Sequence, residues 1–212
     1  MRRINRYIPI RIQNYFYERK EAFLNQVEYT HWESNGYPIP PPHSAKQMII
    51  QKYAKQNSCD ILIETGTYLG DTVYSQRKNF SQIISIELSS CLFKAAQNRF
   101  KDHSHIKILY GNSGKVLPEI MPGIATRSLF WLDGHYSSGK TARGERESPI
   151  FEELQAIFSN NELCHVILID DARLFNGKRD YPTIEELKTY IYEKNPDYKI
   201  ILESDILILT KL

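Results

Sequence analysis

The stretch Ile61-Leu-Ile-Glu64-Thr-Gly66-Thr-Tyr-Leu-Gly70-Asp-Thr72 decides the fold of this chain. An apolar run of strand length ends in an acid, a glycine turn follows, and the start of a helix comes next. This order is typical of a nucleotide-type pocket at the carboxyl end of a strand in an open α/β sheet. Gly66 permits a sharp turn and a close ligand approach because it has no Cβ atom.

From residue 60 onward, strand-like runs alternate with helix-like segments. The strand-like runs are Ile61–Glu64, Ile83–Glu87, Ile106–Tyr110, Leu129–Asp133 and His165–Asp170. The helix-like segments are residues 71–79, 90–101, 114–121 and 148–159, with a further helix over 184–194 that a capping box at Thr183 opens. Such alternation predicts a parallel sheet with helices on both faces.

The end of the chain breaks this alternation. Tyr198–Glu203 and Asp205–Thr210 are two strand-like runs with almost nothing between them. No crossover helix fits there, so the two runs must be antiparallel neighbours. The predicted fold is therefore α/β, a Rossmann-like doubly wound sheet of seven strands, mostly parallel, with an antiparallel C-terminal hairpin strand.

The first 45 residues differ from the rest, which predicts an N-terminal helical appendage or lid over 1–45 and a main domain over 46–212. The segment is aromatic, is basic up to Lys20, and ends in Pro38-Ile-Pro40-Pro-Pro42. A helix is expected over 12–28, and another over 44–56 leads into the first strand. Three roles stay open for the segment: packing on the core, a lid, or a homodimer contact.

Composition excludes several classes of partner. The chain has 212 residues, 42% hydrophobic residues and a net charge of +2, which is too small to argue for nucleic acid. No run approaches the ~20 apolar residues of a membrane span, and no secretory signal is recognisable. Cys59, Cys91 and Cys164 lack metal-ligand spacing, so reduced thiols and a cytoplasmic location are expected.

Polar residues at the ends of the first three strands predict a nucleoside site. Glu64 ends the first strand, and Glu87 ends the second, about twenty residues past the glycine turn, where an acid can accept hydrogen bonds from both ribose hydroxyls. The third strand runs into Gly111-Asn112-Ser113, which would place small polar groups beside an adenine. The alternative for each acid is that it only caps the next helix.

The fourth and fifth strands predict a metal site. Asp133 ends one strand, and Asp170-Asp171 end the other, so three carboxylates would converge at one sheet edge. Unpaired, they would raise one another's pKa, and a divalent cation removes that conflict. Hard oxygen ligands suit Mg²⁺ or a similar ion. The alternative is that Asp171 caps a following helix or turn and Asp133 pairs with a local basic residue.

His135 lies two residues past Asp133, and its unperturbed pKa, about 6.5, suits it to take a proton near neutral pH.

The polar loop over residues 136–147 follows directly, and loops of this kind act as lids or substrate clamps. Its Lys140, Arg143 and Arg146 could hold an anionic group, with solvated surface charge as the alternative.

These pieces resemble the class I S-adenosylmethionine-dependent methyltransferases over residues 44–212. Glu64-Thr-Gly66-Thr-Tyr-Leu-Gly70 resembles their first motif, Glu87 the acid that holds the ribose, and Gly111-Asn112-Ser113 the turn beside the adenine. The resemblance implies S-adenosyl-L-methionine as cofactor. The cofactor-binding residues that it implies are Glu64, Gly66, Thr67, Gly70, Thr72, Glu87, Asn112, Ser113 and Asp133.

Within this class, Asp133 with Asp170-Asp171 resembles the metal triad of the cation-dependent O-methyltransferases. The macrolide and aminocoumarin sugar enzymes are the more similar group, because they carry an acid pair at the second site. In some of them a general base follows the first ligand, as His135 does here. The catechol-type enzymes have a Lys where this chain has Tyr136. The resemblance implies Mg²⁺ or another divalent cation and a small hydroxylated acceptor, a sugar or glycoside.

Two other functions compete with this interpretation. An NAD(P)-dependent oxidoreductase of the short-chain type is suggested by the spacing of Tyr190 and Lys194. That pair lies on the last helix, away from the strand ends, and the first turn lacks Gly-x-Gly-x-x-Gly. A non-catalytic nucleoside-binding module on the same fold is the second alternative, since a fold does not fix a function.

Overall fold

The computed structural model describes residues 10–134 and 148–211. The chain divides into two compact units between Lys46 and Gln47, and the two units are described separately below. The role of the first unit as a lid or a dimer contact stays a prediction.

The N-terminal unit is built on one long helix, α1 (Ile10–Ser34). It extends beyond the predicted 12–28 because neither proline nor glycine occurs between Ile10 and Gly36. Trp32, near its end, donates from Nε1 to the carbonyl oxygen of Pro38 at 2.7 Å. Tyr37 packs edge-on against the same ring at 4.9 Å between centroids, so aromatic contacts fix the turn after the helix.

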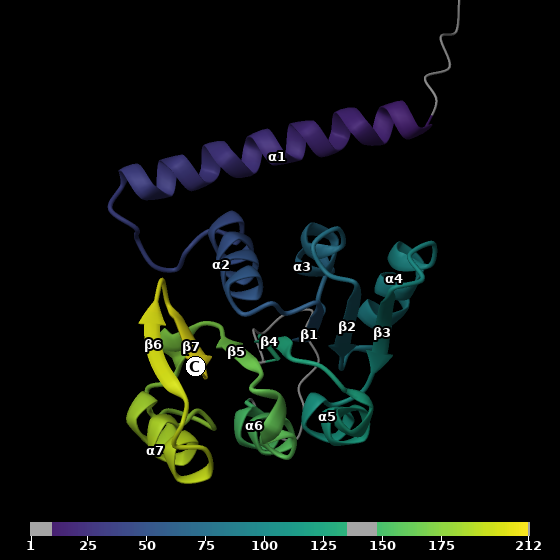
Figure 1. Cartoon of the computed structure of the whole chain (residues 1–212). Helices are drawn as coiled ribbons and strands as arrows, with labels where there is room; N and C mark the ends of the chain where they lie inside the picture. The colour runs from purple at the N-terminus through teal and green to yellow at the C-terminus, as the bar shows by residue number, and fades with distance from the viewer. Residues whose placement is uncertain (1–9, 135–147, 212) are drawn as a thin grey trace, which may run out of the picture. The chain divides into compact units, whose positions relative to one another are not determined.

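The second unit contains one seven-stranded sheet in the order β3-β2-β1-β4-β5-β7-β6 (Figure 1). The strands are β1 (Ile61–Thr65), β2 (Gln82–Glu87), β3 (Ile106–Tyr110), β4 (Ser128–Leu132), β5 (Val166–Ile169), β6 (Lys199–Glu203) and β7 (Ile206–Thr210). All neighbours from β3 through β5 pair in parallel. β7 lies antiparallel between β5 and β6, which confirms the predicted hairpin and fold class.

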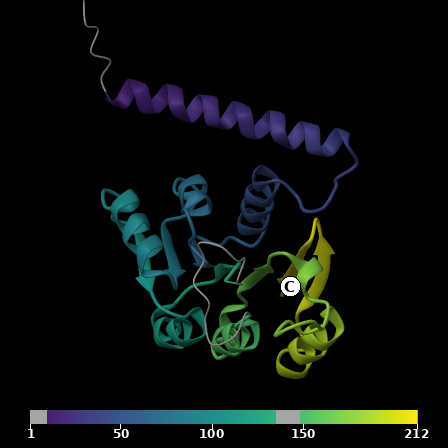
Figure 2. The same cartoon turned by 180° about the vertical axis from the view of Figure 1, so that it is seen from behind.

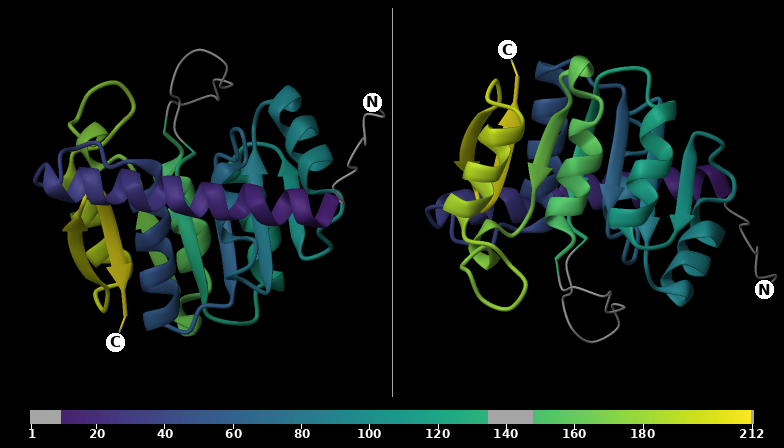
Figure 3. Two further views of the ribbon diagram at one scale, coloured as in Figure 1. Left: turned by 90° about the horizontal axis from the view of Figure 1, so that it is seen from above. Right: turned by 90° about the horizontal axis from the view of Figure 1, so that it is seen from below.

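Helices cover both faces of the sheet. They are α2 (His43–Gln56), α3 (Asp71–Gln76), α4 (Ser90–Phe100), α5 (Ser113–Ile120), α6 (Ile150–Phe158) and α7 (Ile184–Lys194). The part of α2 from residue 47 lies with α3 and α4 on one face, and α5, α6 and α7 cover the other, as the reversed view and the views from above and below show (Figures 2 and 3). Three short 3₁₀ turns complete the described chain: η1 (Met121–Gly123), η2 (Asn161–Leu163) and η3 (Ala172–Leu174).

Each face of the sheet has its own apolar core. On one face, Ile50 of α2 and Phe100 of α4 pack with Trp131 of β4. On the other, Leu154 of α6 and Leu187 of α7 pack with Phe130. Phe130 and Trp131 are consecutive in β4 and therefore pack into opposite cores. A strand buried on both faces is for this reason an unbroken apolar run in the sequence.

Several element ends differ from the predicted ones, and one difference matters for the site. β4 ends at Leu132 and β5 at Ile169, so the acids predicted to end these strands lie on the turns after them. Helix α6 begins at Ile150 rather than at residue 148, and Pro149 is its N-cap. The capping box at Thr183 and Glu186 is confirmed.

The strand order reverses between β1 and β4, at the turn that holds Gly66. Gly66 has φ +85°, and its N–H donates to the carbonyl oxygen of Ile86 at 2.9 Å. A Cβ atom on this residue would lie 2.4 Å from the carbonyl oxygen of Asp133. The glycine is therefore required by the turn after β4 as well as by its own conformation.

No helix within residues 10–134 and 148–211 combines the length and the apolar composition that a membrane span requires.

Replacing Gly66 by alanine is expected to cost far more stability than the same change at Gly177. Both glycines have a left-handed φ, +85° and +74°. The new methyl group would meet backbone at residue 66, but at residue 177 it would meet the side-chain methyl of Thr183 at 2.9 Å. A left-handed alanine alone costs about 1 kcal/mol, and the clash with backbone adds to it. In urea unfolding, the free energy of unfolding should fall about 2 kcal/mol further for G66A than for G177A. An equal fall in the two variants would contradict this expectation.

Candidate functional site

A buried hydrogen-bonded chain links the end of β1 to β2. Glu64 and Ser85 are register partners on these parallel strands, and the Ser85 hydroxyl donates to Glu64 Oε2 at 2.5 Å. The Ser85 and Thr67 hydroxyls lie 2.6 Å apart, and both side chains are buried. Ser85 was not anticipated from the sequence, although a lone serine in the apolar strand β2 is the signal that could have indicated it.

Glu64 is 2% exposed, and burial raises its pKa to about 8. Hydrogen bonds from Ser85 and Thr72 oppose this rise, whereas the negative charges of Asp133 and Glu87 add to it. Glu64 is therefore mostly protonated at neutral pH in this structure. The structure thus brings together Glu64 in β1, Glu87 at the end of β2 and Asp133 after β4.

Glu87 holds the turn after β1. Its Oε2 accepts the N–H of Tyr68 at 2.8 Å, and its Oε1 accepts the N–H of Ser89 at 2.7 Å. The residue is 5% exposed. An ionised carboxylate has about four acceptor positions, so each oxygen keeps capacity for a further donor, such as a hydroxyl group.

Gly70 and Thr72 lie where the glycine turn enters α3. Gly70 has φ +79°, and a Cβ atom there would lie 2.8 Å from Cε2 of Phe100 on α4. This glycine is accordingly explained by its turn and by helix packing. Thr72 lies in the first turn of α3, and its side chain donates a hydrogen bond to Glu64.

The turn after β3 lies beside Glu87. The N–H of Gly111 donates to the carbonyl oxygen of Glu87 at 3.0 Å. Asn112 is the N-cap of α5, and its Oδ1 accepts the N–H of Gly114 at 2.9 Å. Ser113, which follows it, is buried. The side-chain oxygen of Asn112 is therefore engaged in capping α5.

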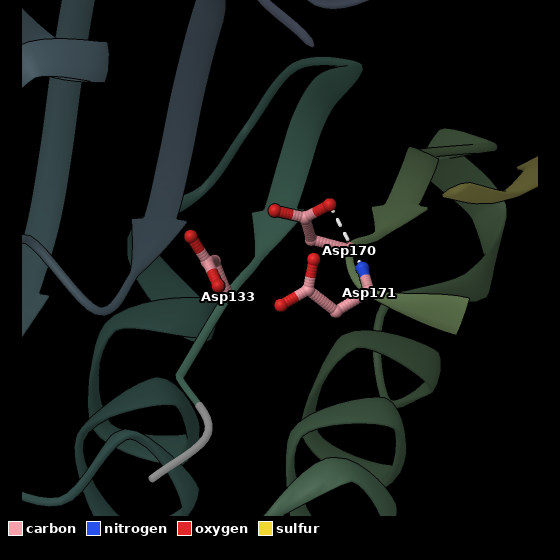
Figure 4. A group of neighbouring side chains, drawn as sticks. All are labelled: Asp133, Asp170 and Asp171. Carbon is pink, nitrogen blue, oxygen red and sulfur yellow. Dashed lines mark hydrogen bonds between the residues drawn. The ribbon is translucent and has the colours of Figure 1, made fainter. Parts of the chain in front are cut away.

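The three predicted metal ligands converge at the ends of β4 and β5 (Figure 4). One carboxylate oxygen from each of Asp133, Asp170 and Asp171 lies within 4.8 Å of the others. Backbone pairing places them: the N–H of Asp133 donates to the carbonyl of Thr65 at 3.1 Å, and that of Asp170 to the carbonyl of Leu132 at 3.0 Å. Asp170 is 1% exposed, so one of the acids is fully buried.

The local contacts of Asp171 contradict the capping alternative, and its role as a metal ligand stays a prediction. It precedes η3, but its side chain makes no capping hydrogen bond there. Its Oδ1 accepts instead from Nη1 of Arg173 at 2.7 Å, and its own N–H donates to Asp170 Oδ1 at 2.8 Å. Arg173 also donates to Asp205. The sequence did not indicate either residue as part of the site, because the two lie 32 residues apart.

His135 and the loop over 136–147, with Lys140, Arg143 and Arg146, lie outside the described residues. Their predicted roles stay predictions. Tyr190, the tyrosine of the competing oxidoreductase pattern, donates from its hydroxyl to the carbonyl oxygen of Phe151 at 3.4 Å. It therefore joins α7 to α6, as a packing residue would.

The sheet order and the inserted antiparallel strand are those of the Rossmann-like methyltransferase fold. Comparison with solved structures agrees. The chain matches the O-methyltransferase TomG from Streptomyces achromogenes, solved with S-adenosylmethionine and involved in tomaymycin synthesis, with a TM-score of 0.58 and 13% identity over 89% of each chain.

Two further matches have the same fold. The Podospora anserina methyltransferase PaMTH1, bound to S-adenosylhomocysteine, gives a TM-score of 0.57 and 14% identity, covering 97% of this chain and 98% of that one. An O-methyltransferase from Bacillus cereus, also with S-adenosylhomocysteine, gives 0.54 and 11% over 88% and 90%. No family model and no curated protein sequence matches the chain. Identities this low establish the shared fold alone.

The raised pKa of Glu64 predicts a pH dependence of stability. The pKa is about 8 in the folded chain against 4.5 for an ordinary glutamate, so the folded state binds more protons than the unfolded state between these values. Stability should then fall as pH rises from 5 to 8, by roughly 2–4 kcal/mol relative to E64Q. Urea unfolding of both proteins across this range tests it. Parallel curves for the two proteins would show that Glu64 ionises normally.

Proposed function

We propose that this chain is an S-adenosylmethionine-dependent O-methyltransferase in which a divalent cation assists the reaction. The proposed acceptor is a small hydroxylated molecule, a sugar or glycoside. The observation that carries this proposal is the convergence of Asp133, Asp170 and Asp171 beside the glycine turn at Gly66. One sheet edge then offers a nucleoside pocket and a cation site side by side.

Three features at or near the ends of β1, β2 and β3 support the cofactor assignment. Glu87 keeps acceptor capacity for ribose hydroxyls while its backbone bonds fix its position. Asn112 and Ser113 begin α5 next to it, where small polar groups can border an adenine. Glu64 places a buried titratable group nearby. When bound, S-adenosylmethionine would supply a methyl group on a positively charged sulfur, and acids at this edge favour a cation.

The donor set fits a hard divalent cation. Three carboxylates are the ligand type that Mg²⁺ prefers, and their spacing within 4.8 Å allows one ion to reach all of them. Arg173 offsets part of the charge on Asp171, and a bound cation would further relieve the repulsion among three acids of which Asp170 is buried. A cation held by Asp133, Asp170 and Asp171 would lower the pKa of a coordinated acceptor hydroxyl.

The remaining chemistry falls to residues of the chain. His135, two residues beyond Asp133 in sequence, is proposed to take the hydroxyl proton. When bound, S-adenosylmethionine would supply the methyl group that the acceptor oxygen takes. The site's main contribution is to hold acceptor and cofactor in line. The acid pair Asp170-Asp171 favours a sugar-type acceptor, on its resemblance to the sugar methyltransferases.

Calorimetric titration with S-adenosylmethionine tests the cofactor assignment. We expect the wild-type chain to bind and E87Q to bind at least about tenfold more weakly, because an amide offers the ribose one oxygen instead of two and carries no charge. The control is E119Q, which changes an exposed glutamate on α5 and should bind like wild type. A folded wild-type sample that binds reduced nicotinamide cofactor but not S-adenosylmethionine would favour the oxidoreductase instead.

Titration with Mn²⁺ tests the cation assignment separately. Asp170→Asn keeps the oxygen that accepts from Asp171 N–H but removes a charge from the triad. Affinity for Mn²⁺ should fall at least about tenfold, since cation affinity follows ligand charge. Binding of S-adenosylmethionine should change little. Asp102→Asn, at an exposed turn, removes the same charge elsewhere and is the control. Equal Mn²⁺ affinity in all these proteins would refute a cation site here.

A further inference from the structure

The turn of the C-terminal hairpin contacts the segment that carries the third acid of the triad. Asp205, the residue before β7, accepts the N–H of Ala172 at its carbonyl oxygen, at 2.8 Å. Its Oδ1 accepts the N–H of Arg173 at 2.8 Å, and its Oδ2 accepts from Nη1 of the same arginine. A single residue of the hairpin thus makes three bonds to the two residues that follow Asp171.

The backbone of Asp171 needs such support. It has φ +52°, a left-handed conformation that is unfavourable for a residue with a Cβ atom. Hydrogen bonds hold it on both sides: its N–H donates to Asp170 Oδ1, and its carbonyl oxygen accepts the N–H of Leu174 at 2.8 Å. The bonds to Asp205 fix the residues between these two points.

The side chain of Asp171 is oriented by the same device. Nη1 of Arg173 donates both to Asp171 Oδ1 and to Asp205 Oδ2. The Asp205 side chain is 3% exposed and that of Asp171 14%, so the arginine is shared between two largely buried acids. Because Asp205 anchors the guanidinium, Arg173 can hold Asp171 by one oxygen without neutralising it entirely.

We propose that Asp205 is a positioning residue that sets the cation affinity of the triad through Arg173 and the backbone after Asp171. This inference rests on the proposed cation site. Asp205 makes no contact with a cation in this account. Residues that surround metal ligands fix the orientation of those ligands by hydrogen bonds, and Asp205 does so for the Asp171 carboxylate through Arg173.

Two variants separate positioning from charge. Asp205→Ala removes both side-chain bonds, whereas Asp205→Asn keeps an oxygen for the N–H of Arg173 and loses the ion pair. Both remove the same negative charge. If Asp205 acted only through its electric field, the two variants would weaken cation binding equally. Positioning predicts a larger loss for alanine.

A matched control lies on the same hairpin. Glu203 accepts from Nζ of Lys52 at 2.8 Å and from the hydroxyl of Tyr53 at 2.7 Å, so it is also an acid with an ion pair to a distant element. E203Q breaks that ion pair and removes one charge from the hairpin. It should weaken the hairpin without altering the segment after Asp171.

The experiment is calorimetric titration of the full chain with Mn²⁺, with S-adenosylmethionine affinity measured on the same samples. We expect about tenfold weaker Mn²⁺ binding in D205A, about threefold in D205N, and a change below about twofold in E203Q, with cofactor affinity unchanged throughout. If D205A does not fold, D205N still tests the proposal, because Mn²⁺ binding as tight as in the wild-type chain would remove the role of Asp205.

Three results would overturn the proposal. Wild-type affinity in D205A and D205N would leave the cation site standing and remove the role of Asp205. Equal losses in D205A and D205N would assign the effect to charge alone. Absence of Mn²⁺ binding in the wild-type chain would refute the cation site itself, and the positioning role with it.

Discussion

The approach of the turn at Gly66 to the carbonyl oxygen of Asp133 is the contact on which the rest of the site depends. It joins the turns after β1 and β4 where the strand order reverses, so the nucleoside side and the acid side share one edge. A side chain at residue 66 would force these turns apart. Open α/β sheets place ligands at such reversal points because the neighbouring loops diverge there.

Concentrating acids at one edge is electrostatically costly, and each acid is stabilised in a different way. Burial raises the pKa of Glu64, which lets it keep its proton. Glu87 instead accepts hydrogen bonds from two backbone N–H groups. Asp171 shares Arg173 with Asp205. Each acid is therefore held by different local contacts.

The C-terminal hairpin serves both the fold and the site. β7 covers the edge of β5 in antiparallel pairing, and Glu203 ties β6 to α2 through Lys52. Two residues later, Asp205 reaches the segment that carries Asp171. An element that looks like a terminal addition in sequence therefore supports the acid cluster.

The sequence by itself determined the sheet, its inserted antiparallel strand, and the strand ends where Glu64, Glu87, Asp133, Asp170 and Asp171 lie, because apolar periodicity and short connections are local signals. It did not indicate Ser85, Arg173 or Asp205 as parts of the site. Nor did it reveal that Gly66 and Gly70 are required by packing against Asp133 and Phe100. Those facts depend on contacts between residues distant in sequence, which only the tertiary structure decides, since burial and pairing partners exist only once the strands are assembled.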